Sequence, residues 1–224
     1  MCQWKSGIAV RVSETDIEVR TLLGKDSHSE IRASHNIPED NGGMVGRGQT
    51  PIEFIPARGF KEQDFDLVFD AGKPEWWTDG MTEQAKSQMW LAVNADMKTG
   101  NVEKLQLTLT CGVELAWLKT GNVDARSAKT VNLPQHTTGN VNANFAKTVS
   151  LPKHTTGNVN ASSAKTVNLP KHTTGYVDAS SAKTVNLPKH TTGYVYASSA
   201  KTVSLPKHTT GDVDAPNAKI VKVS

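Results

Sequence analysis

Apolar positions in the C-terminal half of the chain recur with a period of 18 residues. Each unit starts at a glycine that is followed two positions later by a valine. Counted from that valine, alanines stand at offsets 2 and 5, a second valine at 8, and a Leu-Pro pair at 10 and 11. These offsets neither alternate over a long strand nor keep a helical period. The recurring glycines are Gly121, Gly139, Gly157, Gly175, Gly193 and Gly211.

One turn of a β-solenoid per unit explains this pattern. Offsets 0 and 2 fit a short strand with one face inward, and the regular Pro and Gly exclude long helices. A left-handed hexapeptide helix would place offsets 0, 6 and 12 inside, and two of these are Lys or Gln here. The register extends back to Leu105 and predicts seven units, the first at about residue 103 and the last cut short at Ser224. The second-valine column is expected to run from Val131 to Val221.

The N-terminal segment has a different, mixed pattern. Alternation predicts strands at 7–12, 16–23, 52–56 and 65–69, the first two forming a hairpin. Helices are expected over 26–35 and 80–97, the second capped by Thr78 or Asp79 and ended by Gly100. The fold class is therefore an α+β domain, residues 1–97, followed by a solenoid, 98–224. We expect the first domain to cap the solenoid, since an uncovered end exposes core and strand edge.

Composition and charge also change between the two parts. Residues 119–224 hold 13 Lys and Arg against four Asp and no Glu, a balance of +9. This leaves 12 of the 25 basic and 18 of the 22 acidic residues for 1–118, a balance of −6. The chain has no apolar run long enough to span a membrane and no secretory leader is expected. Cys2 and Cys111 are too few for a disulfide framework, which favours a reducing, cytoplasmic setting.

Two resemblances follow from these motifs. The Val-x-Ala-x-x-Ala-x-x-Val-x-Leu-Pro frame resembles the short bacterial leucine-rich repeat, although it lacks that repeat's Asn and has Ala and Val for several leucines. The whole chain, with its 24–29 (GKDSHS) and 76–82 (WWTDGMT) motifs, resembles a group of uncharacterised prophage proteins of enteric bacteria. The second resemblance implies an interaction scaffold in a phage setting, inside the host bacterial cell, and it transfers no catalytic residue.

Repeated polar side chains provide the candidate binding surface. One histidine per coil should stack at about 4.7–5 Å and stay neutral at pH 7, with lysines beside it. Three interpretations of these columns are open. Duplication of the unit alone explains them, or the lysines form a basic face that binds a polyanion. In the third, a flat threonine array around Thr137 and Thr138 acts on ice or a crystal. Trp76 and Trp77 either form a binding platform or pack in the core. The candidates are Lys153, Lys171, Lys189, Lys207, His154, His172, His190, His208, Lys165, Lys183, Lys201, Tyr176, Tyr194, Tyr196, Trp76 and Trp77.

Candidate chemistry is sparse. Asp26, His28, His35 and Asp40 have spacings that match no metal-ligand motif, so a hydrated surface segment is expected. We therefore predict no enzyme, no cofactor and no metal. The predicted function is a phage-encoded scaffold that binds a host or phage protein, with a host-defence component among the targets considered. Nucleic-acid or polyanion binding through the Lys and His columns is the alternative, and a homodimer through the C-terminal coil is also expected.

Overall fold

A computed structural model describes residues 4–38, 48–107, 109–110, 112–206 and 211–223. The chain divides into two compact units, Met1–Lys104 and Leu105–Ser224. The division falls within the strand β5 (Asn101–Gln106), a few residues after the boundary at 97/98 expected from the sequence. In the part of the chain that the structure describes, no helix is both long and apolar enough to cross a membrane.

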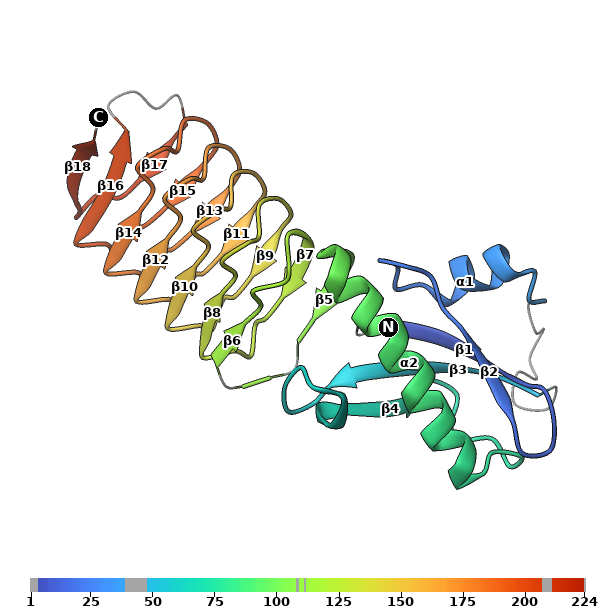
Figure 1. The fold of residues 1–224 in the computed structure, drawn as a ribbon. Coiled ribbons are helices and arrows are strands. Elements are labelled where there is room, and N and C mark those ends of the chain that lie inside the picture. Colours follow the sequence, from blue (N-terminus) through green and yellow to red (C-terminus); the bar gives the residue numbers. More distant parts are fainter. Residues whose placement is uncertain (1–3, 39–47, 108, 111, 207–210, 224) are drawn as a thin grey trace. The chain divides into compact units, whose positions relative to one another are not determined.

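The N-terminal unit contains a four-stranded antiparallel sheet and two helices (Figure 1). The strands lie in the order β2-β1-β3-β4, and the short 3-10 helix η2 (Glu62–Asp64) precedes β4. The predicted hairpin and the two later strands are confirmed. The bounds are β1 (Lys5–Arg11), β2 (Ile17–Arg20), β3 (Gln49–Pro56) and β4 (Phe65–Phe69).

Capping residues mark the ends of both helices. Helix α1 (His28–His35) begins at Ser27, and α2 (Asp79–Thr99) begins at Thr78, whose hydroxyl accepts a hydrogen bond from the Met81 backbone N–H. Gly100 ends α2 in the left-handed conformation. The buried face of α2 carries Met81, Ala85, Met89 and Val93.

Glutamine side chains of α2 cover the open edge of the sheet. Gln84 Oε1 accepts from the Ile17 backbone N–H at 3.0 Å, and Gln88 Oε1 accepts from the Val19 N–H at 2.8 Å. Gln88 Nε2 also donates to the Ile17 carbonyl. The helix thus satisfies backbone groups of β2 that would otherwise offer an edge for aggregation.

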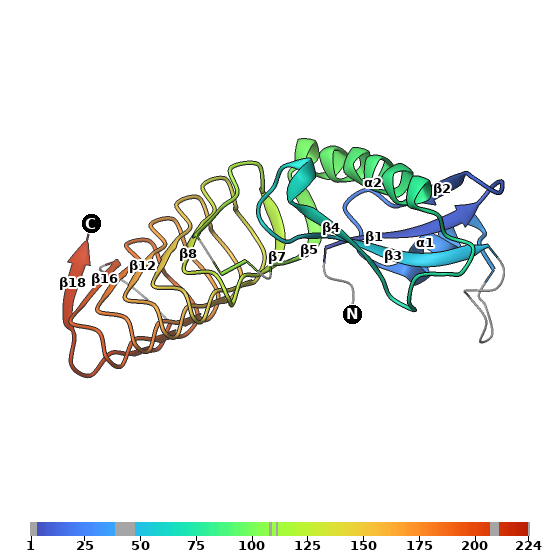
Figure 2. The ribbon, with the colours of Figure 1, turned by 90° about the horizontal axis from the view of Figure 1, so that it is seen from below.

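Residues 101–222 form a β-solenoid of about six turns, built from two parallel sheets (Figures 1 and 2). Each sheet contains seven strands, and together the two sheets form about six turns. The sequence predicts seven units. The first sheet contains β5 (Asn101–Gln106), β7 (Thr120–Asp124), β9 (Val141–Asn142), β11 (Val159–Asn160), β13 (Val177–Asp178), β15 (Val195–Tyr196) and β17 (Val213–Asp214). The second sheet contains β6 (Gly112–Glu114), β8 (Thr130–Asn132), β10 (Thr148–Ser150), β12 (Thr166–Asn168), β14 (Thr184–Asn186), β16 (Thr202–Pro206) and β18 (Lys219–Val223).

The inner coils stack in register, each residue against its counterpart 18 positions away. Val159 pairs with Val141 on one side and Val177 on the other, and the second sheet repeats this at Val149, Val167 and Val185. Parallel bridges between successive threonines, from Thr120 to Thr192, form a third ladder. The valines, alanines and leucines of the predicted frame are fully buried in these coils.

The last coil departs from the period. Val203 pairs with Ile220, which is 17 residues away, and Val221 lies opposite Ser204. The prediction that Val221 occupies the valine column is therefore wrong. Ile220 and Val221 are both exposed in this coil.

Candidate functional sites

The histidines of the repeat lie inside the solenoid, in contrast to the exposed position expected for them. His136, His154, His172 and His190 each have an exposed fraction of 0%. Their rings stack almost in parallel, with centroids 5.2 Å apart, slightly more than the expected spacing. His154, His172 and His190 are therefore excluded from a binding surface, and His208 lies outside the described residues.

Three of the four histidines are held by a carbonyl of the preceding coil, whereas the Nδ1 atoms of His190 and His172 lie 3.1 Å apart. Nε2 of His154 lies 3.0 Å from the Gly139 oxygen, and His136 and His172 make the same contact with Gly121 and Gly157. Since a carbonyl only accepts, Nε2 carries a proton. Nδ1 of His136 and of His154 is buried with no hydrogen-bond partner among the described residues.

Burial sets the ionisation of this column. Desolvation lowers the pKa of all four imidazoles, and the pKa of His154 and of His190 falls to about 4. The hydrogen bond that the imidazole donates to the glycine carbonyl opposes this shift only in part. The imidazoles are thus neutral at pH 7 as expected, but the main cause is burial, with repulsion between the rings a smaller one.

The lysines do lie on the surface, in two columns that border the second sheet. One column stands directly before the strands, or at the first residue in β18: Lys129, Lys147, Lys165, Lys183, Lys201 and Lys219. The other follows the Leu-Pro pair and contains Lys153, Lys171 and Lys189, whereas Lys207 lies outside the described residues. All nine described lysines are exposed. Between the columns, Thr and Asn or Ser side chains cover the outer face of the strands.

Three tyrosines form an exposed cluster on the first sheet, which we call the tyrosine patch. Tyr176, Tyr194 and Tyr196 are 40%, 43% and 39% exposed. The ring centroids of Tyr176 and Tyr194, and those of Tyr194 and Tyr196, are 6.3 Å apart. All four aspartates of the repeat region stand in the same two outer columns of this sheet: Asp124, Asp178, Asp212 and Asp214.

These aspartates act on the tyrosines electrostatically. Asp214 raises the pKa of Tyr196 through its charge and a hydrogen bond, and desolvation followed by the charge of Asp178 raises that of Tyr176. The two sheets therefore differ in charge, the first being acidic and aromatic and the second basic at its borders.

The paired tryptophans pack within the N-terminal unit. Trp77 is buried, contacts Phe69 edge to face at 4.8 Å, and donates its indole N–H to the Thr82 hydroxyl at 2.9 Å. Trp76 is half-buried beside it, with the Arg11 guanidinium 5.8 Å from its ring centroid. Of the two alternatives, core packing is thus the correct one for Trp77.

One of the two threonine columns uses its hydroxyls within the stack. The hydroxyls of Thr137, Thr155, Thr173 and Thr191 each donate to a carbonyl of the preceding coil, at 3.0–3.2 Å. These protons stabilise the stack, so this column does not offer them to ice or to another crystal.

A polar cluster in the N-terminal unit was only partly visible in the sequence. His28 stands at the start of α1, with Nδ1 3.3 Å from Asp70 Oδ2 and Nε2 3.5 Å from Glu53 Oε1. Glu53 is buried in the middle of β3, and Asp70 directly follows β4. Because Ile52 pairs with Phe69, the antiparallel register brings Glu53 and Asp70 to the same place.

Ser6 connects this cluster to Asp26. Its hydroxyl lies 2.6 Å from Asp26 Oδ1 and 3.0 Å from Glu53 Oε1. Burial raises the pKa of Asp26 to about 7, the Ser6 hydrogen bond lowers it, and the Glu53 charge raises it further. The expectation of a hydrated surface is therefore wrong for Asp26 and His28. His35 is exposed and contacts the Thr21 carbonyl, and Asp40 lies outside the described residues.

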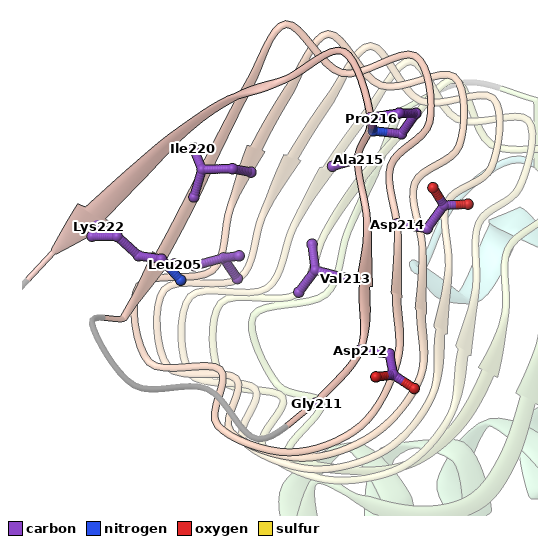
Figure 3. A pocket seen from close by; sticks show the side chains of 9 residues that line it. All are labelled: Leu205, Gly211, Asp212, Val213, Asp214, Ala215, Pro216, Ile220 and Lys222. Carbon is purple, nitrogen blue, oxygen red and sulfur yellow. The ribbon is translucent and has the colours of Figure 1, made fainter.

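The C-terminal coil opens into a cavity of about 560 Å³ (Figure 3). Figure 3 shows Leu205 and Val213 pointing into the coil and Asp214 pointing away from it. In the described chain, β17 and β18 are the last strands of their sheets.

Comparisons with protein-family models, with curated proteins and with solved structures each find no match.

Proposed function

We propose that this protein is a non-enzymatic, phage-encoded scaffold whose solenoid binds a host or phage protein in the bacterial cytoplasm. The tyrosine patch is the observation that carries this proposal. Tyrosine supplies a large contact area at a low cost in conformational entropy and is enriched at protein interfaces. Here three such rings are presented together, by β15 and by the residues directly before β13 and β15, and both strands pair with the neighbouring coils on either side.

The charge around the patch indicates a basic partner surface. Asp178 and Asp214 lie close enough to the tyrosines to raise their pKa values. Lysine and arginine side chains of a partner would pair with these carboxylates and stack on the rings.

Two structural interpretations also belong to this proposal. The first is that the coil is of the leucine-rich-repeat type, which rests on its Leu-Pro frame. The second is that the N-terminal domain caps the solenoid.

Affinity capture from infected host cells tests the scaffold role. We expect a protein retained by the wild-type chain to be lost from a Tyr194→Ala/Tyr196→Ala variant and to survive raised salt. Phe145→Ala is the matched control, because Phe145 is an exposed aromatic residue of the same solenoid outside the patch. Equal retention by the double variant and the wild type would contradict the proposal.

The lysine columns support polyanion binding as a second candidate. Lys165 and Lys183 are exposed, and neither forms an ion pair within the described residues. Successive lysines are only about 4.8 Å apart along the stack, so their mutual repulsion is relieved by a bound anion. For this candidate, the logarithm of the binding constant for a nucleic acid should fall linearly with the logarithm of the salt concentration. The slope should be shallower for the Lys165→Gln/Lys183→Gln variant.

The expected homodimer is a further part of the proposal. The edge strand β18 and the cavity beside it offer a place for a second copy to add its own edge. Light scattering should then give a dimer that becomes monomeric with Val221→Pro, since proline removes an edge donor. A wild-type chain that is monomeric at high micromolar concentration would contradict it.

A further inference from the structure

We propose that His28, Glu53 and Asp70 bind a divalent transition-metal ion of the zinc type in the N-terminal unit. One ligand atom from each residue lies within 4.8 Å of the other two. Two atoms on one tetrahedral zinc ion, each about 2.0–2.2 Å from it, are about 3.3–3.6 Å apart. Side-chain movements of up to about 1.5 Å would therefore bring all three onto one ion, in departure from the absence of a metal expected from sequence.

The surroundings of His28 suit a metal ligand. Its Nε2 lies 3.2 Å from the Ile52 carbonyl and 3.5 Å from Glu53 Oε1, and these two acceptors fix the proton on that nitrogen. Metal-binding histidines usually donate their second N–H in this way, which orients the ring and directs the other nitrogen at the ion. Here the other nitrogen, Nδ1, is 3.3 Å from Asp70 Oδ2. Two ligand atoms of a tetrahedral zinc site have about this separation.

Glu53 contributes a buried carboxylate to the cluster. Its side chain is 2% exposed, and the Ser6 hydroxyl lies 3.0 Å from Oε1. A buried carboxylate is costly unless opposite charge or hydrogen bonds compensate it. Asp26, on the other side of Ser6, adds a further carboxyl group to the same cluster. The His28 imidazole faces two carboxyl groups, those of Glu53 and Asp70, and a divalent ion balances this pair better than a protonated His28 does.

The ligand set also indicates which metal. Imidazole nitrogen favours zinc and its neighbours over magnesium and calcium, which prefer oxygen ligands throughout. Three protein ligands leave a fourth position of a tetrahedron open. The Asp70 side chain is 34% exposed, so this position faces solvent and is accessible to water.

Zinc titration of the full-length chain tests the site. After treatment with a chelator and its removal, isothermal calorimetry and native mass spectrometry should show one Zn²⁺ per chain at micromolar or lower concentration. Asp70→Asn preserves the side chain's shape and should weaken binding at least tenfold, as should His28→Gln. Thermal unfolding should shift upward with Zn²⁺ in the wild type, by mass action, and not in these variants.

His35→Gln is the matched control, since His35 lies on the same helix, is exposed and is outside the cluster. It should bind Zn²⁺ as the wild type does. The alternative, a protonated His28 shared between Glu53 and Asp70, predicts no zinc binding at 100-fold molar excess, and that result would overturn the proposal. Unchanged affinity in Asp70→Asn, or displacement of Zn²⁺ by an equal concentration of Mg²⁺, would overturn it as well.

Discussion

The two units bury polar groups in opposite ways. The N-terminal unit buries one ion pair, in which Lys5 Nζ lies 2.8 Å from Asp96 Oδ2 and both side chains are almost inaccessible. Lys5 also donates to the Leu22 carbonyl, and Asp96 accepts from the Gly24 N–H. The solenoid instead buries a neutral imidazole in each of four successive coils.

Repetition explains this difference. A charge repeated in every coil would meet its own copy about 5 Å away in a medium of low dielectric constant, where like charges repel strongly. A neutral ring with one donor and one carbonyl acceptor can be copied without that cost. The N-terminal unit has no repeat, so a single lysine can be matched to a single aspartate 91 residues away. Repeating cores therefore restrict which polar groups can be buried, and unique cores do not.

The largest expected effect comes from placing a charge in the repeating core. Val177 is fully buried, and Val177→Asp would leave an unpaired carboxylate between two coils. We expect the repeat region to lose its β-type circular dichroism signal, a destabilisation of at least about 4 kcal/mol. Lys183→Glu, on the exposed side of the same coil, should cost less than about 0.5 kcal/mol. Equal melting temperatures for the two variants would refute the inward valine column.

Acid should affect the solenoid through its histidines. In the unfolded chain these imidazoles have the ordinary pKa of 6.5, whereas in the fold the pKa of His154 and His190 is about 4. Below pH 6.5 the unfolded chain therefore binds more protons, so stability is lost as the pH falls from 6.5 to 4. The loss is on the order of 3 kcal/mol for each of these two residues.

A melting-temperature series between pH 7.5 and 4 measures this effect. His154→Gln removes one titrating group, so its curve should be shallower than that of the wild type. Parallel curves would show that the buried column does not set the acid response.

Breaking the unique ion pair should destabilise the other unit. Asp96→Ala leaves the Lys5 ammonium buried with only the Leu22 carbonyl, which costs about 3–5 kcal/mol. Asp79→Ala, which removes the exposed pair with Lys73, should cost less than about 1 kcal/mol. A Lys5→Met/Asp96→Leu double variant should recover much of the loss in chemical denaturation, because it leaves no buried charge. If Asp96→Ala is as mild as Asp79→Ala, the pair is not the stabilising contact described.

The sequence was sufficient for the architecture because the period and the alternation are local signals. An 18-residue repeat of Val, Ala and Leu predicts a stacked coil, and caps such as Thr78 and Gly100 mark the helix ends. The direction of the histidines was missed because they follow a Leu-Pro turn, where alternation no longer indicates which side faces inward. Their acceptor, a glycine carbonyl 15 residues earlier, becomes evident only when coils are stacked.

The polar cluster was missed for a different reason. Glu53 and Asp70 are far from His28 in sequence, and no ligand spacing connects the three. The antiparallel register of β3 with β4, together with the start of α1, brings them together. The one-residue slip at Ile220 was equally invisible, because the repeat pattern by itself continues to Val221.

The smallest expected effects compare two glycines, one from each unit. Gly157 has φ +124, and a Cβ there would lie 2.3 Å from the Gly139 carbonyl oxygen of the preceding coil. That backbone is held by the coil beneath it and cannot move away, so Gly157→Ala should cost roughly 2–3 kcal/mol. Gly72 also has a positive φ, +84, but nothing lies within 4 Å of its Cβ position. Gly72→Ala therefore carries only the conformational cost, about 1 kcal/mol. Urea denaturation of both variants measures how much each substitution lowers the free energy of unfolding. The difference between the two values is the part that comes from close packing of the coils rather than from the backbone preference of glycine. If the two substitutions cost the same, the coils are not packed as closely as the glycine column requires.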